Sequence, residues 1–212
     1  MKTKLTLLFI AAASFFVQAQ NTEACTETLS LMATSVKAKD VASYDYLTTL
    51  RKDCPSFHKS IYTLGEFAVK LKIEKATTPQ DKEKYVRDLL KLYDEHDQYF
   101  PGNGAGNKMK KGLVLFENKV GTTDEVFQLL DVAFKTDYAN FKYAKAMYVY
   151  FEILVNNHKA NKGVELQQVF DKYDDISKKL DEEEKELSEE NDTFLTKEEA
   201  GQALTDKEKT RK

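Results

Sequence analysis

The chain has 212 residues, with 32 basic and 35 acidic side chains and a formal charge of −3 at pH 7. Because this charge is negative, nucleic acids and anionic membrane surfaces are disfavoured as partners. Only three prolines, eight glycines and no tryptophan, together with abundant Lys, Glu, Leu and Ala, favour an all-α fold.

The first 19 residues have the layout of a secretory signal peptide. Lys2 and Lys4 precede an apolar run from Leu5 to Val17, and the small residue Ala19 follows. We expect cleavage after Ala19 and a periplasmic or secreted protein with a formal charge of −5. No later stretch approaches the roughly 20 apolar residues of a membrane span.

The two cysteines, Cys25 and Cys54, both follow this segment. If the residues between them form an antiparallel helix pair, its ends lie side by side, and we predict a disulfide there. In the loop-entropy model this bond contributes about 3 to 4 kcal/mol. The alternative to a disulfide is that both cysteines are buried free thiols. A lipid anchor on Cys25 is a second alternative, which the carboxylate of Glu23 and the early end of the apolar run oppose.

In the N-terminal half, apolar residues recur at helical spacing, with Ser56 and Thr78 as expected helix caps. Pro101 and Gly102 end one of these helices, and a glycine-rich loop follows. The expected helices cover residues 25–37 and 41–52, a stretch beginning at Ser56, residues 79–99 and residues 107–119.

In the C-terminal half, we expect helices from Thr123, over Asn140–Asn157, and from about Val164 to Leu180. The Asn140–Asn157 stretch is apolar on two faces, which predicts packing on both sides. One face holds Phe141, Ala144, Tyr148, Phe151 and Val155, and the other holds Tyr143, Met147, Tyr150 and Leu154. Beyond Leu180 the sequence becomes strongly acidic. We therefore expect one helical domain over residues 20–190 with a long acidic C-terminal helix, then a polar and largely flexible tail over residues 191–212. Residues 197–204 are a possible short helix in it, and Phe194, Leu195 and Leu204 are candidates for docking back.

The stretch around Pro55 resembles the tetratricopeptide repeat, a 34-residue helix-turn-helix unit with the pattern W-x2-L-G-x2-Y, A-x3-F and a closing proline. With Pro55 on the closing position, Ser43 and Leu47 fall on the small and aromatic positions. In the same register the next W, L, G and Y positions hold Ile61, Leu64, Gly65 and Ala68. The first helix departs from the pattern, with Glu27 and Ser30 at its W and L positions. The resemblance implies about four stacked antiparallel hairpins over residues 25–180, a tetratricopeptide-like α-solenoid.

Motifs of catalysis or metal binding are not recognisable in this sequence. The loop at Gly102–Gly106 lacks the lysine and hydroxyl pattern of a P-loop, and it follows a helix where that motif requires a strand. His58, His96 and His158 are scattered, without the spacing of a zinc helix. The segment 171–182 has acids at three calcium-loop positions but Ile176 at the required glycine. We therefore expect no enzyme activity, no metal site and no cofactor.

The leading hypothesis is a non-enzymatic interaction scaffold of the cell envelope. Stacked hairpins leave a concave face lined by the inner helix of each unit, which suits a protein or peptide partner. The residues that we assign to partner binding are Tyr62, Lys70, Asn118 and Lys145. The alternative is a small-molecule or glycan-binding protein, or a weak hydrolase, with a pocket near the Gly102–Gly106 loop and His96.

Overall fold

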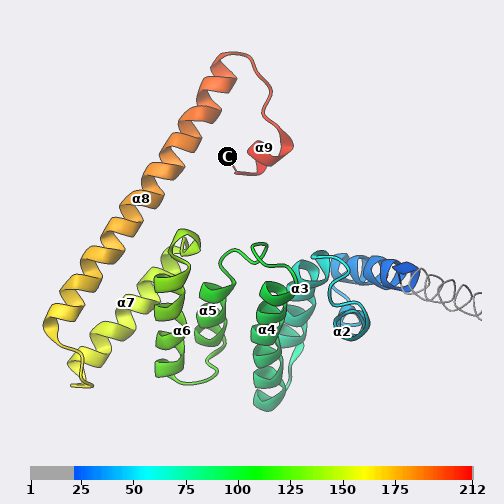
Figure 1. Cartoon of the computed structure of the whole chain (residues 1–212), viewed down its shortest axis with the longest axis horizontal. Helices are drawn as coiled ribbons and strands as arrows, with labels where there is room; N and C mark the ends of the chain where they lie inside the picture. The colour runs from blue at the N-terminus through cyan, green and yellow to red at the C-terminus, as the bar shows by residue number, and fades with distance from the viewer. Residues whose placement is uncertain (1–21, 212) are drawn as a thin grey trace, which may run out of the picture. The chain divides into compact units, whose positions relative to one another are not determined.

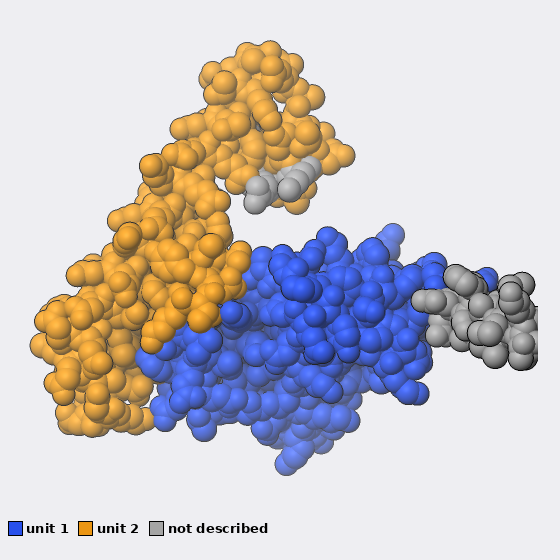
Figure 2. All heavy atoms as spheres, viewed as in Figure 1, with its two compact units in different colours: residues 1–133 blue, residues 134–212 orange. Residues whose placement is uncertain are grey.

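The computed structural model describes residues 22–211, and over this range it is helical without a strand (Figure 1). The predicted signal peptide lies outside the described residues. The chain divides into two compact units at residue 133 (Figure 2), where the sequence predicts one domain up to residue 190. Among the described residues, no helix combines the length and the apolar character needed to cross a membrane.

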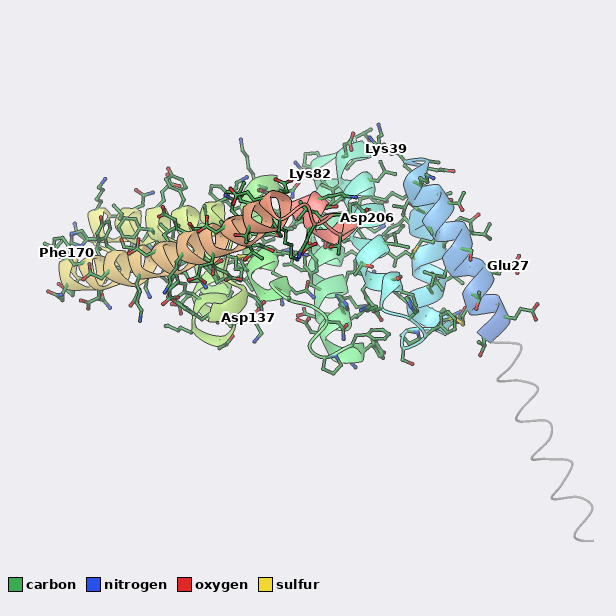
Figure 3. The ribbon with its side chains drawn as sticks, turned by 90° about the horizontal axis from the view of Figure 1, so that it is seen from above. Glu27, Lys39, Lys82, Asp137, Phe170 and Asp206 are labelled. Carbon is green, nitrogen blue, oxygen red and sulfur yellow. A yellow bond between two sulfur atoms is a disulfide. The ribbon has the colours of Figure 1, made fainter. Side chains whose placement is uncertain are left out.

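The first hairpin of unit 1 joins a helix over residues 22–37 to α2 (Ser43–Asp53). Lys39, which Figure 3 labels, lies in the turn between these helices and has a left-handed backbone conformation. The predicted disulfide between Cys25 and Cys54 is present, with the two Cα atoms 6.0 Å apart. It ties the start of the first helix to the end of α2, so the hairpin is closed at both ends.

The second hairpin consists of α3 (Ser60–Lys75) and α4 (Pro79–Tyr99). Thr78 caps α4 as predicted, because its hydroxyl accepts a hydrogen bond of 3.1 Å from the Asp81 amide. The predicted cap at Ser56 is wrong. Residues 55–57 form a turn in which the Phe57 amide donates to the Cys54 carbonyl, and α3 begins at Ser60 without a side-chain cap.

Gly65 brings the first two hairpins into close contact. A Cβ atom placed on Gly65 would lie 2.7 Å from Cδ1 of Leu47 in α2 and 3.3 Å from Cδ2 of Leu92 in α4. A side chain at this position would therefore push α3 away from both neighbours.

The third hairpin consists of α5 (Asn107–Asn118) and α6 (Thr123–Thr136). Gly112 repeats the contact seen at Gly65, since a Cβ atom there would lie 2.7 Å from Cγ of Leu130. The Arg87 guanidinium of α4 forms an ion pair with Glu125 of α6 and links the second and third hairpins. Phe116 of α5 is 38% exposed.

Unit 2 contains the end of α6, a short 3-10 helix (Tyr138–Asn140), α7 (Ala144–Lys159), α8 (Leu166–Glu199) and α9 (Asp206–Arg211). The rings of Phe134, Phe141 and Tyr150 form its core, with the Phe134 centroid 5.2 Å from Phe141 and 5.6 Å from Tyr150. Because Phe141 is buried ahead of the helix, α7 begins at Ala144 and not at Asn140.

Packing on both sides of α7 is found in part, since Tyr150 contacts Phe134 of α6 and Phe151 contacts Tyr173 of α8. Met147, Tyr150 and Leu154 are buried on one face, while Ala144 and Tyr148 of the second predicted face are exposed. Tyr148 is 62% exposed, and its hydroxyl donates to Glu152 on the same helix. An apolar pattern does not distinguish aromatic residues at the surface from aromatic residues in the core.

The acidic helix α8 runs to Glu199, beyond the residue 190 boundary at which the sequence predicts a flexible tail. Ion pairs four residues apart support it, including Lys179 with Glu183 at 2.6 Å and Lys185 with Glu189 at 3.9 Å. Phe194 and Leu204 are buried where the tail folds back and Lys197 pairs with Glu208. The third candidate for docking, Leu195, stays 44% exposed.

Candidate functional site

Unit 1 has a surface groove between its first two hairpins, with a volume of about 300 Å³. The end of the first helix, the turn after it, the start of α2 and the C-terminal half of α3 supply its walls. We call it the α3 groove. Its lining residues are Val36, Lys39, Ser43, Phe67, Lys70, Leu71, Glu74 and Lys75.

The helical repeat of α3 explains why these residues gather. Phe67, Lys70, Leu71 and Glu74 are spaced by three, four and seven residues, so they share one face of the helix. The opposite side, which includes Gly65, packs against α2 and α4. One face of α3 therefore holds the hairpins together, and the other is left for the groove.

The floor of the groove is apolar. Val36, Phe67 and Leu71 supply aliphatic and aromatic surface, and the Phe67 side chain is 62% exposed. Ser43 is fully buried, and its hydroxyl donates to the Asp40 carbonyl at 2.7 Å. Because the Ser43 hydroxyl is satisfied within the protein, the groove offers a ligand mainly apolar contact at this point.

The rim of the groove is basic. It carries Lys39, Lys70 and Lys75 against one acid, Glu74, a formal charge of +2. The Lys70 ammonium lies 2.6 Å from Glu66, but its side chain is 52% exposed, so this ion pair is weak and can rearrange. An apolar floor within a basic rim fits a ligand that has an apolar group beside carboxylates.

Of the four residues predicted to bind a partner, the structure brings only Lys70 to the groove. Tyr62 is 2% exposed, and its hydroxyl donates to the Pro55 carbonyl at 2.9 Å. Assigning it to partner binding is therefore wrong, because its ring is part of the core. Asn118 is half-buried at the end of α5 and donates to the Val114 carbonyl on its own helix. Lys145 is exposed on α7, in the other unit.

The Gly102–Gly106 loop connects α4 to α5 by local hydrogen bonds. The Asn103 amide donates to the Phe100 carbonyl at 3.0 Å, and the Asn107 amide donates to the Gly104 carbonyl at 2.9 Å. A Cβ atom on Gly104 would lie 1.9 Å from the Asp97 carboxylate, so the space behind the loop is filled. The α3 groove lies elsewhere, and no residue of this loop lines it.

His96 lies in the core behind this loop. It is 5% exposed, its ring stacks on Tyr62 with the centroids 5.3 Å apart, and its Nδ1 is 3.4 Å from the side-chain Nδ2 of Asn107. Burial lowers the pKa of His96, which keeps the imidazole neutral, although the nearby Asp97 opposes this effect. Nε2 makes no hydrogen bond to any residue between 22 and 211. The arrangement is that of a core histidine.

Sequence reasoning missed Phe67, the main apolar residue of the groove. The signal was present, because Phe67 falls outside the buried stripe of α3 that runs through Ile61, Leu64 and Ala68. A large aromatic residue on the polar side of an amphipathic helix indicates a contact surface. No sequence pattern indicated Lys39, because this residue lines the groove only as a result of how the turn after the first helix folds.

Within residues 22–211 no group of three His, Cys, Asp or Glu side chains is arranged to hold a metal ion. Neither protein-family models, nor curated proteins, nor solved structures give a match to this chain. The function of the α3 groove therefore has to be inferred from its lining residues.

Proposed function

We propose that the protein is an interaction scaffold that binds a segment of another protein in the α3 groove. The observation that carries this proposal is an exposed phenylalanine, Phe67, in the lining of a groove that also holds three lysines. An isolated exposed apolar side chain needs no explanation, but one inside a charged concavity indicates a contact site.

The groove suits a segment that places one apolar side chain next to carboxylates. Covering Phe67 removes apolar surface from water and contributes about 1.5 to 3 kcal/mol. Carboxylates of the bound segment, next to its apolar side chain, would face Lys39 and Lys70. Such charge pairs increase the specificity and the association rate more than they increase the affinity. The volume of about 300 Å³ fits one or two side chains rather than a folded domain.

The cell envelope is the proposed location. A disulfide between Cys25 and Cys54 supports an oxidising compartment, because disulfides are rare in the cytosol. The signal-peptide pattern of residues 1–19 points the same way.

A peptide-display selection tests the proposal. The disulfide-bonded chain without residues 1–19 is immobilised and panned with a random peptide library, and the peptides recovered are sequenced. We expect enrichment of peptides with an aromatic or aliphatic residue beside two or more Asp or Glu residues. A synthetic peptide of that sequence should bind about tenfold more weakly to the Lys70→Glu variant.

Lys52→Glu is the matched control, because Lys52 is 81% exposed on α2 and does not line the groove. This variant makes the same charge change and should bind the selected peptide like the parent. Equal losses in both variants would show a general charge effect, and selected peptides without an acidic preference would contradict the proposal. If a small anionic amphiphile displaces the bound peptide at a lower concentration than unlabelled peptide does, the groove is a small-molecule site instead.

A further inference from the structure

Helix α8 carries an exposed apolar stripe with a seven-residue repeat. Leu166, Tyr173, Leu180 and Leu187 follow one another at this spacing, and Phe170 lies beside the first two. All five side chains are exposed, from 43% for Leu180 to 64% for Leu187. Figure 3 labels Phe170 near the start of the helix. We call these five residues the α8 stripe.

The buried contact between α8 and the rest of unit 2 lies beside this stripe. Ile176 and Lys179 are the buried residues in the first half of α8, and the Lys179 ammonium lies 4.5 Å from the centre of the Tyr138 ring. Tyr173 approaches Phe151 of α7, with the ring centroids 6.0 Å apart, yet it remains 57% exposed. The packing of unit 2 thus leaves every residue of the α8 stripe at least 43% exposed.

The stripe has the dimensions of a helix-binding surface. From Leu166 to Leu187 it spans 21 positions, or about 31 Å at the rise of an α-helix. In a coiled coil each helix contributes apolar residues at two positions of every seven, and the α8 stripe supplies one of these positions, with Phe170 added near its start. The repeat ends at Phe194, which is buried where the C-terminal tail folds back.

The charge of α8 identifies the kind of helix that would cover it. Residues 166–199 include thirteen acidic and five basic side chains, a formal charge of −8. Asp174, Asp181 and Glu184 are exposed next to the stripe. A second copy of α8 would bring an equal negative charge against the first, which disfavours self-association.

We propose that the α8 stripe binds a basic amphipathic helix of another protein. Such a helix has apolar residues three and four positions apart along one face, with Lys or Arg on both flanks. Its apolar residues cover Leu166, Tyr173, Leu180 and Leu187, and its flanking cations face the carboxylates of α8. This site is in unit 2 and selects a basic partner, whereas the α3 groove is in unit 1 and selects an acidic one.

Fluorescence anisotropy with a designed probe tests the inference. The probe is a labelled peptide of about 28 residues, four heptads with Leu at the two core positions, Lys on the flanks and Ala elsewhere. We expect it to bind the disulfide-bonded chain and to become helical. Leu187→Asn should weaken binding about tenfold, because it places an unpaired amide in the apolar contact.

Leu195→Asn is the matched control, since Leu195 is an exposed leucine of the same helix that lies beyond the stripe, about 80° around the helix from Leu187. It should bind the probe like the parent. A peptide with Glu in place of every Lys should not bind. Equal weakening in both variants, binding of the acidic peptide, or no binding at all would overturn the inference. A dimer in sedimentation that Leu187→Asn dissociates would overturn it too, by showing that a second copy covers the stripe.

Discussion

At the scale of single residues, Arg51 of α2 makes a polar contact to two carboxylates in unit 1. Its guanidinium lies 2.8 Å from Asp88 and 2.7 Å from Glu95, and both carboxylates belong to α4. The Tyr44 hydroxyl donates to the same Asp88 at 3.0 Å. The three charged side chains are between 11% and 19% exposed, so water does little to replace the contact.

Replacing Arg51 by Met should therefore lower the free energy of unfolding by about 3 kcal/mol, because Asp88 and Glu95 would keep their negative charges without a cation between them. Urea denaturation at neutral pH measures the change. Lys91→Met is the control, since Lys91 also approaches Glu95, at 3.7 Å, but is 71% exposed. It should cost less than about 1 kcal/mol, and equal effects of the two variants would contradict this view of Arg51.

We expect His96 to make the free energy of unfolding of unit 1 depend on pH. Burial lowers the pKa of His96 in the folded chain below the value near 6.5 of an exposed histidine. Below that pH the unfolded chain binds more protons than the folded one, so the free energy of unfolding should fall as the pH drops. Burial also raises the pKa of the neighbouring Asp97, which acts in the opposite sense over its own titration range.

His96→Phe isolates the histidine contribution, because phenylalanine can keep the ring contact with Tyr62 but cannot titrate. Urea midpoints at about pH 7.5 and about pH 5 give the slope for each chain. We expect the parent to lose more stability than the variant over this interval. The same slope in both chains would show that His96 is protonated equally in the folded and unfolded states.

At the scale of helices, Gly65 sets the distance between α3 and α2. Gly65→Ala should lower the free energy of unfolding by about 1 to 3 kcal/mol, because the new methyl group would lie 2.7 Å from Leu47. In a Leu47→Ala background the same change should become neutral or stabilising by up to about 1 kcal/mol, since alanine is the better helix former and the clash is gone. Additive effects in this double-mutant cycle would contradict direct contact.

Local rules predicted the helix boundaries where the deciding residues are adjacent in sequence. Thr78 and Pro79 begin α4, and Pro101 follows the end of it, as the sequence indicates. The Cys25–Cys54 disulfide was also predictable, because a hairpin of two helices brings its ends together. The prediction of a cap at Ser56 was wrong because a serine suits both a helix cap and a turn, and Ser56 lies in a turn.

The errors in unit 2 have a different cause. The end of α8 was placed too early because its apolar pattern stops, although pairs such as Lys185 and Glu189 still support a helix. Tyr148 was assigned to a buried face because aromatic residues count as apolar in a periodicity, yet its hydroxyl side is in solvent. Both errors come from using apolar spacing as the only signal.

At the scale of the whole molecule, the two units offer surfaces of opposite charge. The α3 groove has a rim of Lys39, Lys70 and Lys75, whereas α8 has a formal charge of −8. The groove could not be predicted from the sequence, because Lys39 reaches it through a turn some 30 residues from Lys70. The tetratricopeptide resemblance stays a proposal that rests on Ser43, Leu47 and the in-phase residues of α3.

Site-specific photo-crosslinking tests most directly whether the α3 groove binds a protein. A benzophenone amino acid replaces Phe67 in one variant and Phe116 in a control, which is also an exposed phenylalanine of unit 1 but lies outside the groove. Both variants are produced in the cell envelope, irradiated, and analysed by mass spectrometry. We expect one defined adduct from position 67 alone, attached to a partner segment with an apolar side chain beside carboxylates. No adduct at position 67, or the same adducts from both positions, would contradict the role of the groove.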